Sequence, residues 1–225
     1  MENTIIKLKK ILIENLKKIA FKYLKLGKPN YLYCVEPAQL AAIVNELSRL
    51  KDIKANIAEI GVARGLTTRF ICEHIVNEEM QKNLKFFAID TFDSFTDEDL
   101  DFEVKNRGKI LNDLKGFEYN DFNVWKKNFE KFPFLEAIQS DCSIVDYDRL
   151  GPLKLTFLDV DLYVPTLTTL EKVYKATISG GVILVDDVRE NHTYDGAFDA
   201  YNKFCDKNKL PKKVIGNKCG LIVKP

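Results

Sequence analysis

The stretch Phe157-Leu158-Asp159-Val160-Asp161-Leu162-Tyr163 decides the fold class, and Val185-Asp186-Asp187 repeats its pattern. In each stretch an apolar run ends abruptly in carboxylates. A short apolar run of this kind is typical of a buried strand. If two such strands ended side by side, their four carboxylates would share one small volume, where like charges raise each other's pKa unless a cation lies between them. The two stretches therefore predict either a metal site or an unusual acid–base site.

Outward from these stretches, strand patterns alternate with helix patterns along most of the chain. Gly180-Gly181 are expected to close the turn between a helix and the strand that follows it. Alternation of this kind predicts an α/β fold, a Rossmann-like three-layer sandwich with a mostly parallel seven-stranded sheet, an antiparallel C-terminal strand and additional N-terminal helices. The expected strands are 57–61, 86–90, 137–141, 153–160, 182–185, 213–215 and 221–223, and the expected helices are 2–28, 38–50, 66–76, 165–178 and 196–208.

Acidic residues stand at five of the predicted strand ends. Parallel sheets of this class bind ligands at the carboxyl ends of their strands. A single acid there would be typical of a turn or a cap, but five together favour a functional rim. The acids are Glu59, Asp90, Asp141, the pair Asp159 and Asp161, and the pair Asp186 and Asp187.

A glycine loop follows the first of these strands. Its spacing is E-x-G-x-x-x-G, from Glu59 through Gly61 to Gly65. Gly61 permits a tight turn, Gly65 permits backbone to approach a ligand, and an acid in the loop suits an amine-bearing ligand better than a pyrophosphate. Asp90, at the end of the next strand, is placed to accept hydrogen bonds from ribose hydroxyls. Asp141 and Cys142 close the third strand, where an adenine edge would fall.

These residues resemble two nested families. The stretch 59–65, EIGVARG, looks like motif I of class I S-adenosylmethionine-dependent methyltransferases. The segments DTFD at 90–93, LDVDLY at 158–163, GGVI at 180–183, DD at 186–187 and DGA at 195–197 look like the macrocin O-methyltransferase family, which methylates sugar hydroxyls of natural products. The resemblance runs from about residue 36 to the end of the chain.

The resemblance implies a role for each strand-end residue. It implies S-adenosylmethionine as methyl donor, with Glu59, Gly61 and Gly65 at its methionine part, Asp90 at the ribose, and Asp141 and Cys142 at the adenine. It also implies a divalent cation, Mg²⁺ or a similar ion, on Asp159, Asp186 and Asp187, and Asp161 as the general base. His192 is either a second catalytic residue that contacts the acceptor or an ordinary loop histidine.

The chemistry of hydroxyl methylation agrees with this assignment. A sugar hydroxyl has a pKa far above neutral, so a hard cation that lowers this pKa and a carboxylate that takes the proton are both useful. The expected acceptor is a sugar, a glycoside or another small molecule with a hydroxyl. The rival interpretations are a catechol-type O-methyltransferase, which usually pairs Asp with Asn at the double-acid position, and an NAD-linked dehydrogenase.

Two segments stand apart from the strand–helix alternation. Residues 96–132 are too long for a plain connection and are predicted to be mostly helical, forming either a cap or lid over the site or a solvated surface helix.

Residues 2–28 are predicted to form a helix that carries an apolar stripe and eight lysines, and Gly27 and Pro29 are expected to end it. We expect this helix to pack on its own domain or on a second subunit, as in a homodimer; contact with a membrane surface is the alternative. The predicted domains are 1–35 and 36–225.

The composition sets the broad class. The chain has 225 residues, 46% of them hydrophobic and 30% charged, which is typical of a globular protein. A net charge of +1 gives no overall field that would recruit nucleic acid. Five separated cysteines, no secretory signal and no apolar run long enough for a membrane span predict reduced thiols in a cytoplasmic protein.

Overall fold

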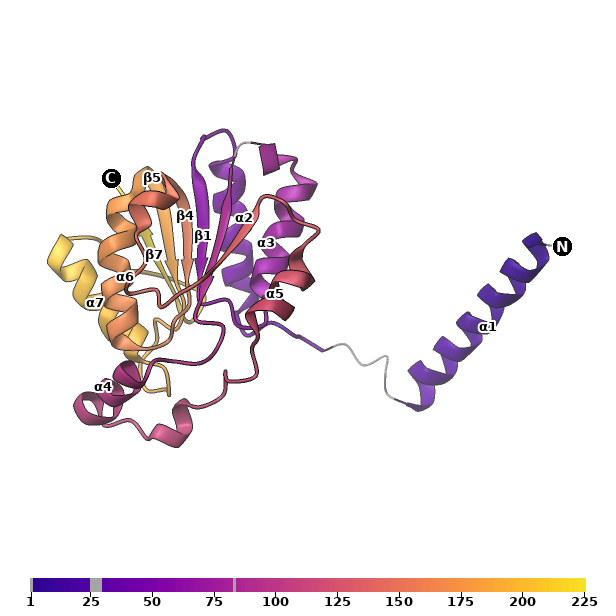
Figure 1. Ribbon diagram of the computed structural model, residues 1–225, viewed down its shortest axis with the longest axis horizontal. Helices are drawn as coiled ribbons and strands as arrows, with labels where there is room; N and C mark the ends of the chain where they lie inside the picture. The colour runs from indigo at the N-terminus through magenta and orange to yellow at the C-terminus, as the bar shows by residue number, and fades with distance from the viewer. Residues whose placement is uncertain (1, 25–29, 83) are drawn as a thin grey trace. The chain divides into compact units, whose positions relative to one another are not determined.

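The computed structural model describes residues 2–24, 30–82 and 84–225, and the chain divides into two units, Met1–Tyr33 and Cys34–Pro225. The first unit contains α1 (Glu2–Tyr23). The second contains all the strands and the other helices (Figure 1). Its elements are α2 (Pro37–Arg49), β1 (Asn56–Ile60), α3 (Leu66–Asn77), η1 (Met80–Lys82), β2 (Phe86–Asp90), α4 (Asp97–Arg107), η2 (Leu111–Leu114), α5 (Phe122–Phe129), β3 (Leu135–Gln139), η3 (Tyr147–Leu150), β4 (Leu153–Leu158), α6 (Tyr163–Ala176), β5 (Thr177–Val185), α7 (Gly196–Asn208), β6 (Lys213–Ile215) and β7 (Cys219–Val223).

The seven strands form one sheet in the order β3-β2-β1-β4-β5-β7-β6. Neighbours from β3 to β5 pair in parallel, and β7 runs antiparallel to both β5 and β6. The order reverses direction between β1 and β4, and right-handed crossovers then place α3 and α6 on opposite faces of the sheet. Helices accordingly cover both faces (Figure 1), and the predicted three-layer Rossmann-like sandwich is confirmed.

Apolar runs create the central strands. All six residues of β4 are buried, and four of the five residues of β1 are. Strands covered by helices on both faces have no solvent side, so they lack the alternation of a half-exposed strand. This burial explains why most of the acids begin where the strands end, because a charged carboxylate inside β4 would lie in a dry core. Glu59, inside β1, is the exception.

Several boundaries differ from the sequence prediction; the strand predicted at 153–160 ends at Leu158, and the helix predicted at 165–178 is α6, Tyr163–Ala176. Gly180 and Gly181 do not close a turn before a strand, because β5 already begins at Thr177. The β4–β5 pairing shifts register between Leu153 and Leu155, which pair with Thr177 and Val182. Gly180 lies in the stretch of β5 between these two partners and has a φ of +75°. The strand predicted at 137–141 lies at Leu135–Gln139, so Asp141 belongs to the loop beyond β3.

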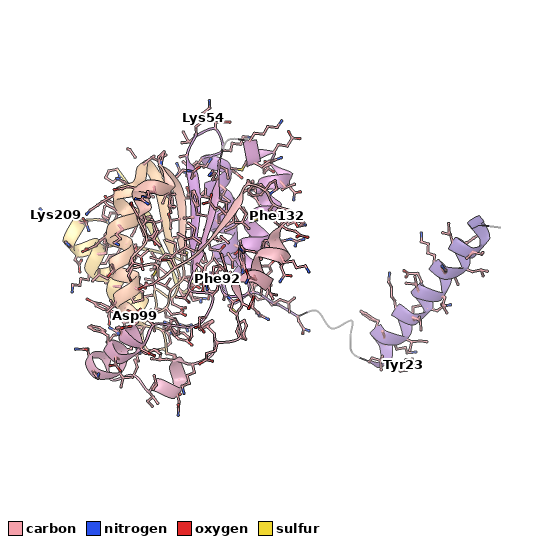
Figure 2. The ribbon with its side chains drawn as sticks, viewed as in Figure 1. Tyr23, Lys54, Phe92, Asp99, Phe132 and Lys209 are labelled. Atoms are coloured by element: carbon pink, nitrogen blue, oxygen red, sulfur yellow. The ribbon has the colours of Figure 1, made fainter. Side chains whose placement is uncertain are left out.

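The segment 96–132 is helical only in parts. It contains α4, the short η2 and α5, joined by irregular chain. Asp99, labelled on α4 in Figure 2, accepts a hydrogen bond from the Thr96 hydroxyl at 2.7 Å. Phe92, labelled beside the sheet in the same figure, packs its ring on Trp125 of α5, with centroids 5.2 Å apart. The Phe92–Trp125 contact anchors the α5 part of the segment to the folded unit, and Glu103 anchors α4 by accepting the Tyr163 backbone N–H at 2.7 Å.

The N-terminal unit has a helix shorter than the predicted 2–28. α1 ends at Tyr23, and the proposed stop signals Gly27 and Pro29, with Leu26 of the stripe, lie outside the described residues. Among the described helices, none combines the length and the apolar character that crossing a bilayer requires.

Candidate active site

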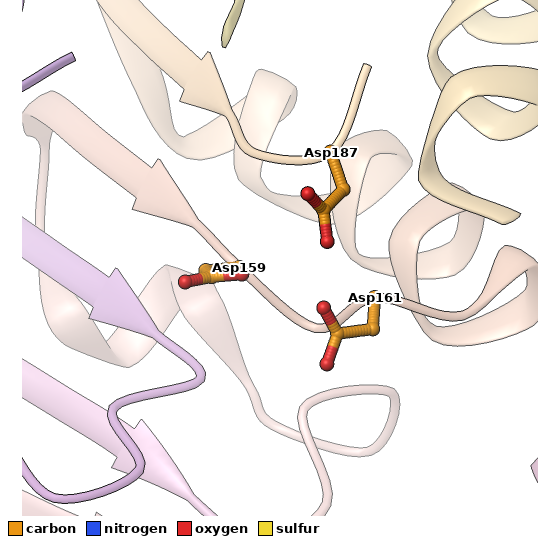
Figure 3. A group of neighbouring side chains, drawn as sticks. All are labelled: Asp159, Asp161 and Asp187. Carbon is orange, nitrogen blue, oxygen red and sulfur yellow. The ribbon is translucent and has the colours of Figure 1, made fainter. Parts of the chain in front are cut away.

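The ends of β4 and β5 bring three carboxylates together. Leu158 pairs with Val185 in parallel register, so the residues that follow both strands reach the same edge of the sheet. One oxygen each of Asp159, Asp161 and Asp187 lies within 4.8 Å of the others (Figure 3). Asp161 and Asp187 both adopt left-handed backbone, with φ of 62° and 56°. Aspartate tolerates this conformation better than most residues, and it turns these side chains toward one another.

The electrostatics of this cluster are unfavourable for several negative charges. Burial, reinforced by the neighbouring aspartates, raises the pKa of Asp159 and of Asp161 well above the ordinary range. Burial and the charge of Asp187 also raise the pKa of Asp186. Lys218 opposes these effects, with its Nζ 3.1 Å from Asp186 Oδ2 and 2.8 Å from Asp187 Oδ1. One lysine does not balance four carboxylates, so the cluster is suited to a further cation.

Asp186 stands apart from the other three. Its Oδ1 accepts hydrogen bonds from Gln39 Nε2 at 2.7 Å and from the Asp187 backbone N–H at 2.6 Å, and its Oδ2 accepts from Lys218. The grouping differs from the predicted ligand set of Asp159, Asp186 and Asp187 with Asp161 free. The left-handed backbone at Asp187 directs that side chain toward Asp161, while Asp186, in the turn directly after β5, accepts its hydrogen bond from Gln39 of α2.

The glycine loop at the end of β1 touches the cluster directly. Gly61 has a φ of +80°, and a Cβ there would lie 1.7 Å from the backbone oxygen of Asp159. Just before it, Glu59 is 1% exposed, and its Oε2 has no hydrogen-bond partner among the described residues. Burial, with a smaller contribution from Asp90, raises the pKa of Glu59 to about 8. The end of β1 therefore carries a buried carboxyl group, one oxygen of which has no hydrogen-bond partner among the described residues.

Gly65, which was predicted to approach the methionine part of the methyl donor, lies next to aromatic side chains of α5. It caps the start of α3 in left-handed backbone, and a Cβ there would lie 2.5 Å from the Phe129 ring and 3.0 Å from Trp125 Nε1. Gly65 also lines neither of the two cavities described below. Its missing side chain makes room for the aromatic residues of α5, so the structure brings Gly65 against packing side chains instead of a ligand cavity.

The first cavity lies beyond β1, β2 and β3. Asp90 lines it and also anchors the glycine loop, because its Oδ2 accepts the backbone N–H groups of Val62 at 2.7 Å and Ala63 at 3.1 Å. Its other oxygen accepts from Phe92 N at 2.7 Å. Further lining residues are Gly61, Ala63, Thr91, Phe95, Thr96, Asp99, Phe117, Asn120, Asp141, Cys142 and Asp161. The predicted residues Asp90, Asp141 and Cys142 therefore share one cavity.

The second cavity is wider and contains the carboxylate cluster. It is lined by Glu59, Gly61, Ala63, Arg64, Thr67, Phe117, Tyr119, Asp159, Asp161, Asp186, Asp187, Arg189, His192, Tyr194 and Lys218, among others. Gly61, Ala63, Phe117 and Asp161 line both cavities. The two cavities therefore meet at Asp161, beside the glycine loop.

His192 lies on the wall of the second cavity. Its Nδ1 accepts the Tyr194 backbone N–H at 3.2 Å, and its Nε2 is 3.4 Å from the backbone oxygen of Asp187. Lys109 Nζ donates to the His192 backbone oxygen at 2.9 Å, which ties the loop to the end of α4. The imidazole is thus held beside the carboxylate cluster without contacting its side chains directly.

Three residues at the site escaped the sequence analysis. Gln39 and Lys218 bind the Asp186–Asp187 pair, and Asn120 Nδ2 donates to the Ala63 backbone oxygen at 2.8 Å, tying the segment 96–132 to the glycine loop. Gln39 could have been suspected as a polar residue among the apolar positions of its helix. Lys218 and Asn120 lie in irregular chain, where no periodicity marks them.

The sheet order, the glycine loop after β1 and the acid ending β2 together define a class I S-adenosylmethionine-dependent methyltransferase. The particular family follows from the sequence of the same elements. The chain belongs to the macrocin-O-methyltransferase (TylF) family, whose model matches residues 37–218, and it is an S-adenosylmethionine-dependent O-methyltransferase. This membership excludes the NAD-linked dehydrogenase interpretation.

Solved structures share the fold at low sequence identity. The O-methyltransferase NovP has a TM-score of 0.68 and 15% identity, covering 87% of this chain and 83% of its own. The calicheamicin methyltransferase CalS11 has a TM-score of 0.68 and 16% identity, covering 92% and 85%, and its apo form is described as a TDP-rhamnose 3'-O-methyltransferase. A putative caffeoyl-CoA O-methyltransferase from Staphylococcus aureus has a TM-score of 0.51 and 13% identity, covering 98% and 96%. Comparison with curated protein sequences gives no significant match.

Proposed function

We propose that this protein methylates a hydroxyl group of a sugar or glycoside, with a divalent cation at the strand-end aspartates. The observation that carries the proposal is the meeting of the two cavities at Asp161. A methyl transfer requires the donor and the acceptor to approach along one line, and a carboxylate at their boundary is placed to take the hydroxyl proton.

The donor fits the first cavity and the glycine loop. The unpartnered Oε2 of the buried Glu59 is an acceptor in need of a donor, which the amino group of the methionine part would supply. Asp90 is assigned to the ribose and the Asp141–Cys142 turn to the adenine, since these residues line the same cavity. Gly61 belongs to the methionine end, where a side chain would collide with the Asp159 backbone.

The chemistry of the donor set fits a hard divalent cation. Asp159 and Asp187 offer carboxylate oxygens within 4.8 Å of each other and of Asp161, the ligand type that Mg²⁺ prefers. Asp186 is assigned a positioning role, because its two oxygens already accept from Gln39, the Asp187 backbone and Lys218. Lys218 and Gln39 would hold Asp186 and Asp187 in place when the cation binds.

The acceptor is assigned to the second cavity. When bound, the cation would lower the pKa of an acceptor hydroxyl and fix the position of its oxygen. Asp161 would take the proton from that hydroxyl, and His192 would contact the acceptor from the wall next to Asp187. Phe117, Tyr119 and Tyr194 line this cavity and would offer aromatic contacts to a sugar, the acceptor type that is also named for CalS11. The segment 96–132 would act as a cap, since it contributes walls to both cavities.

A catechol-type acceptor is the rival proposal. Catechols are included in the test because the fold is also shared with the putative caffeoyl-CoA O-methyltransferase from Staphylococcus aureus. The purified protein would be incubated with S-adenosylmethionine and Mg²⁺ against nucleotide sugars, glycosides and catechols, and demethylated donor would be measured. We expect turnover with a sugar acceptor and none with catechols, and loss of turnover when EDTA replaces Mg²⁺. Turnover with catechols alone would refute the sugar assignment, and turnover that survives EDTA would refute the cation.

A further inference from the structure

The helix α1 carries a wide apolar face. Leu8, Leu12 and Leu16 are 61%, 61% and 56% exposed, and Ile13 and Ile19 are also exposed. At about 100° per residue, the apolar side chains from Leu8 round to Ile13 cover an arc of about 140°, which Lys9 interrupts near one end. This arc is much wider than the narrow seam of a coiled coil. The face is broad enough to lie against a surface as well as against another helix.

Outside this arc, α1 carries five of its six lysines, with the exposed Ile11 and Phe21 among them. Residues 2–24 contain six lysines and two glutamates, a net charge of +4, whereas the whole chain has +1, so the remaining residues sum to −3. Only Lys17 pairs with an acid among the described residues, with its Nζ 2.8 Å from Glu14. Positive charge is thus concentrated on the same 22-residue helix that exposes the apolar face.

The spacing of the stripe does not match an uninterrupted left-handed coiled coil between two copies of the helix. Its members Ile5, Leu8, Leu12, Leu16, Ile19 and Tyr23 are separated by three, four, four, three and four residues, an 11-residue repeat. A left-handed coiled coil needs a seven-residue repeat. Continued from Ile5 with three-four spacing, such a repeat places Asn15 and Lys22 in the seam, and with four-three spacing it places Lys9 there. Two copies would also bring together two helices of equal positive charge.

We propose that α1 binds an anionic membrane surface, lying parallel to it. Its apolar face would enter the boundary between headgroups and acyl chains, and its lysines would reach the lipid phosphates. The net positive charge selects anionic over zwitterionic lipid. The occupant of the face is therefore a phospholipid surface, and the globular unit would be tethered beside it.

The test is sedimentation of the full-length protein with lipid vesicles. We expect it to bind vesicles of phosphatidylcholine mixed with phosphatidylglycerol, much more weakly to phosphatidylcholine alone, and less as salt rises. Leu12→Glu with Leu16→Glu should abolish binding. Lys10→Gln with Lys18→Gln should weaken it by roughly five-fold per lysine. Lys51→Gln with Lys54→Gln, two exposed lysines of the globular unit, is the charge-matched control and should change nothing.

Other occupants of the face give distinguishable results. Equal binding to both vesicle types, or none to either, would overturn the proposal. A dimer detected by light scattering and abolished by Leu12→Glu, without vesicle binding, would assign the face to a second copy. A fall in melting temperature with Leu12→Glu, again without vesicle binding, would show that the face packs within the chain.

Discussion

Asp161 is a residue at which the two cavities meet. Its substitution is expected to affect the methyl-transfer step without affecting the binding of S-adenosylmethionine. Asp161→Asn removes the proton acceptor but retains the side-chain shape and the tolerance of left-handed backbone. We expect kcat to fall by roughly 10²–10⁴-fold, the usual contribution of a general base, while S-adenosylmethionine binding measured by calorimetry is unchanged. Asp148→Asn, at an exposed aspartate, should leave both values unaltered. A full-rate Asp161→Asn enzyme would remove Asp161 from the mechanism.

Glu59 makes stability depend on pH. Burial raises its pKa from 4.5 to about 8 in the folded protein, so the folded state holds a proton that the unfolded state releases between these values. The cofactor-free protein should therefore lose stability as pH rises from about 4.5 to 8, by up to about 5 kcal/mol at about 1.4 kcal/mol per pH unit. Glu59→Gln should flatten this slope in denaturant titrations. An identical slope in the variant would contradict the prediction.

Lys218 is the counter-charge of the carboxylate cluster. Its side chain is 14% exposed and bonds to Asp186 and Asp187, so Lys218→Met leaves buried carboxylates uncompensated. We expect the metal-free protein to lose about 3 kcal/mol of unfolding free energy. Lys212→Met, which breaks an exposed pair with Asp206, should cost less than about 1 kcal/mol. Equal losses in the two variants would show that Lys218 has no special role.

The loop between β1 and α3 depends on close approach of two strand ends. In Gly61→Ala the new Cβ would lie 1.7 Å from the Asp159 oxygen, so β4 and its aspartates would have to move. We expect a large drop in melting temperature and loss of S-adenosylmethionine binding. Gly108 also has a positive φ, +69°, but a Cβ there would meet nothing within 4 Å, so Gly108→Ala should cost only about 1 kcal/mol. If the two variants behaved alike, backbone strain alone would explain Gly61.

The elements differ in how well their sequence predicts them. β1, β2, β4 and the hairpin of β6 and β7 follow from local apolar runs with clear ends, and the structure confirms them. The start of β5 was misplaced because Gly180-Gly181 resemble a turn, whereas the register of β4 and the pairing with β7 extend the strand through them. A pairing partner outside the local sequence determined that boundary.

Metal binding should be visible in the stability of the whole protein. Mg²⁺ that binds only the folded state at a hundred-fold excess over its Kd would add about 2.7 kcal/mol, raising the melting temperature by roughly 5–10 °C for a domain of this size. The rise should disappear in Asp187→Asn and persist in Asp148→Asn. The absence of any Mg²⁺-dependent rise in the wild-type protein would argue against the cation.

The local sequence was sufficient to predict the class of fold and the edge of the sheet where the site lies. Apolar runs that end in Asp90, Asp159 and Asp186 mark buried strands and their carboxyl ends, because burial and charge act on residues adjacent in the chain. The grouping of Asp161 with Asp159 and Asp187 required the tertiary structure, as did the bonds from Gln39 and Lys218. Those contacts join residues up to 147 positions apart, and strand register and left-handed turns create them.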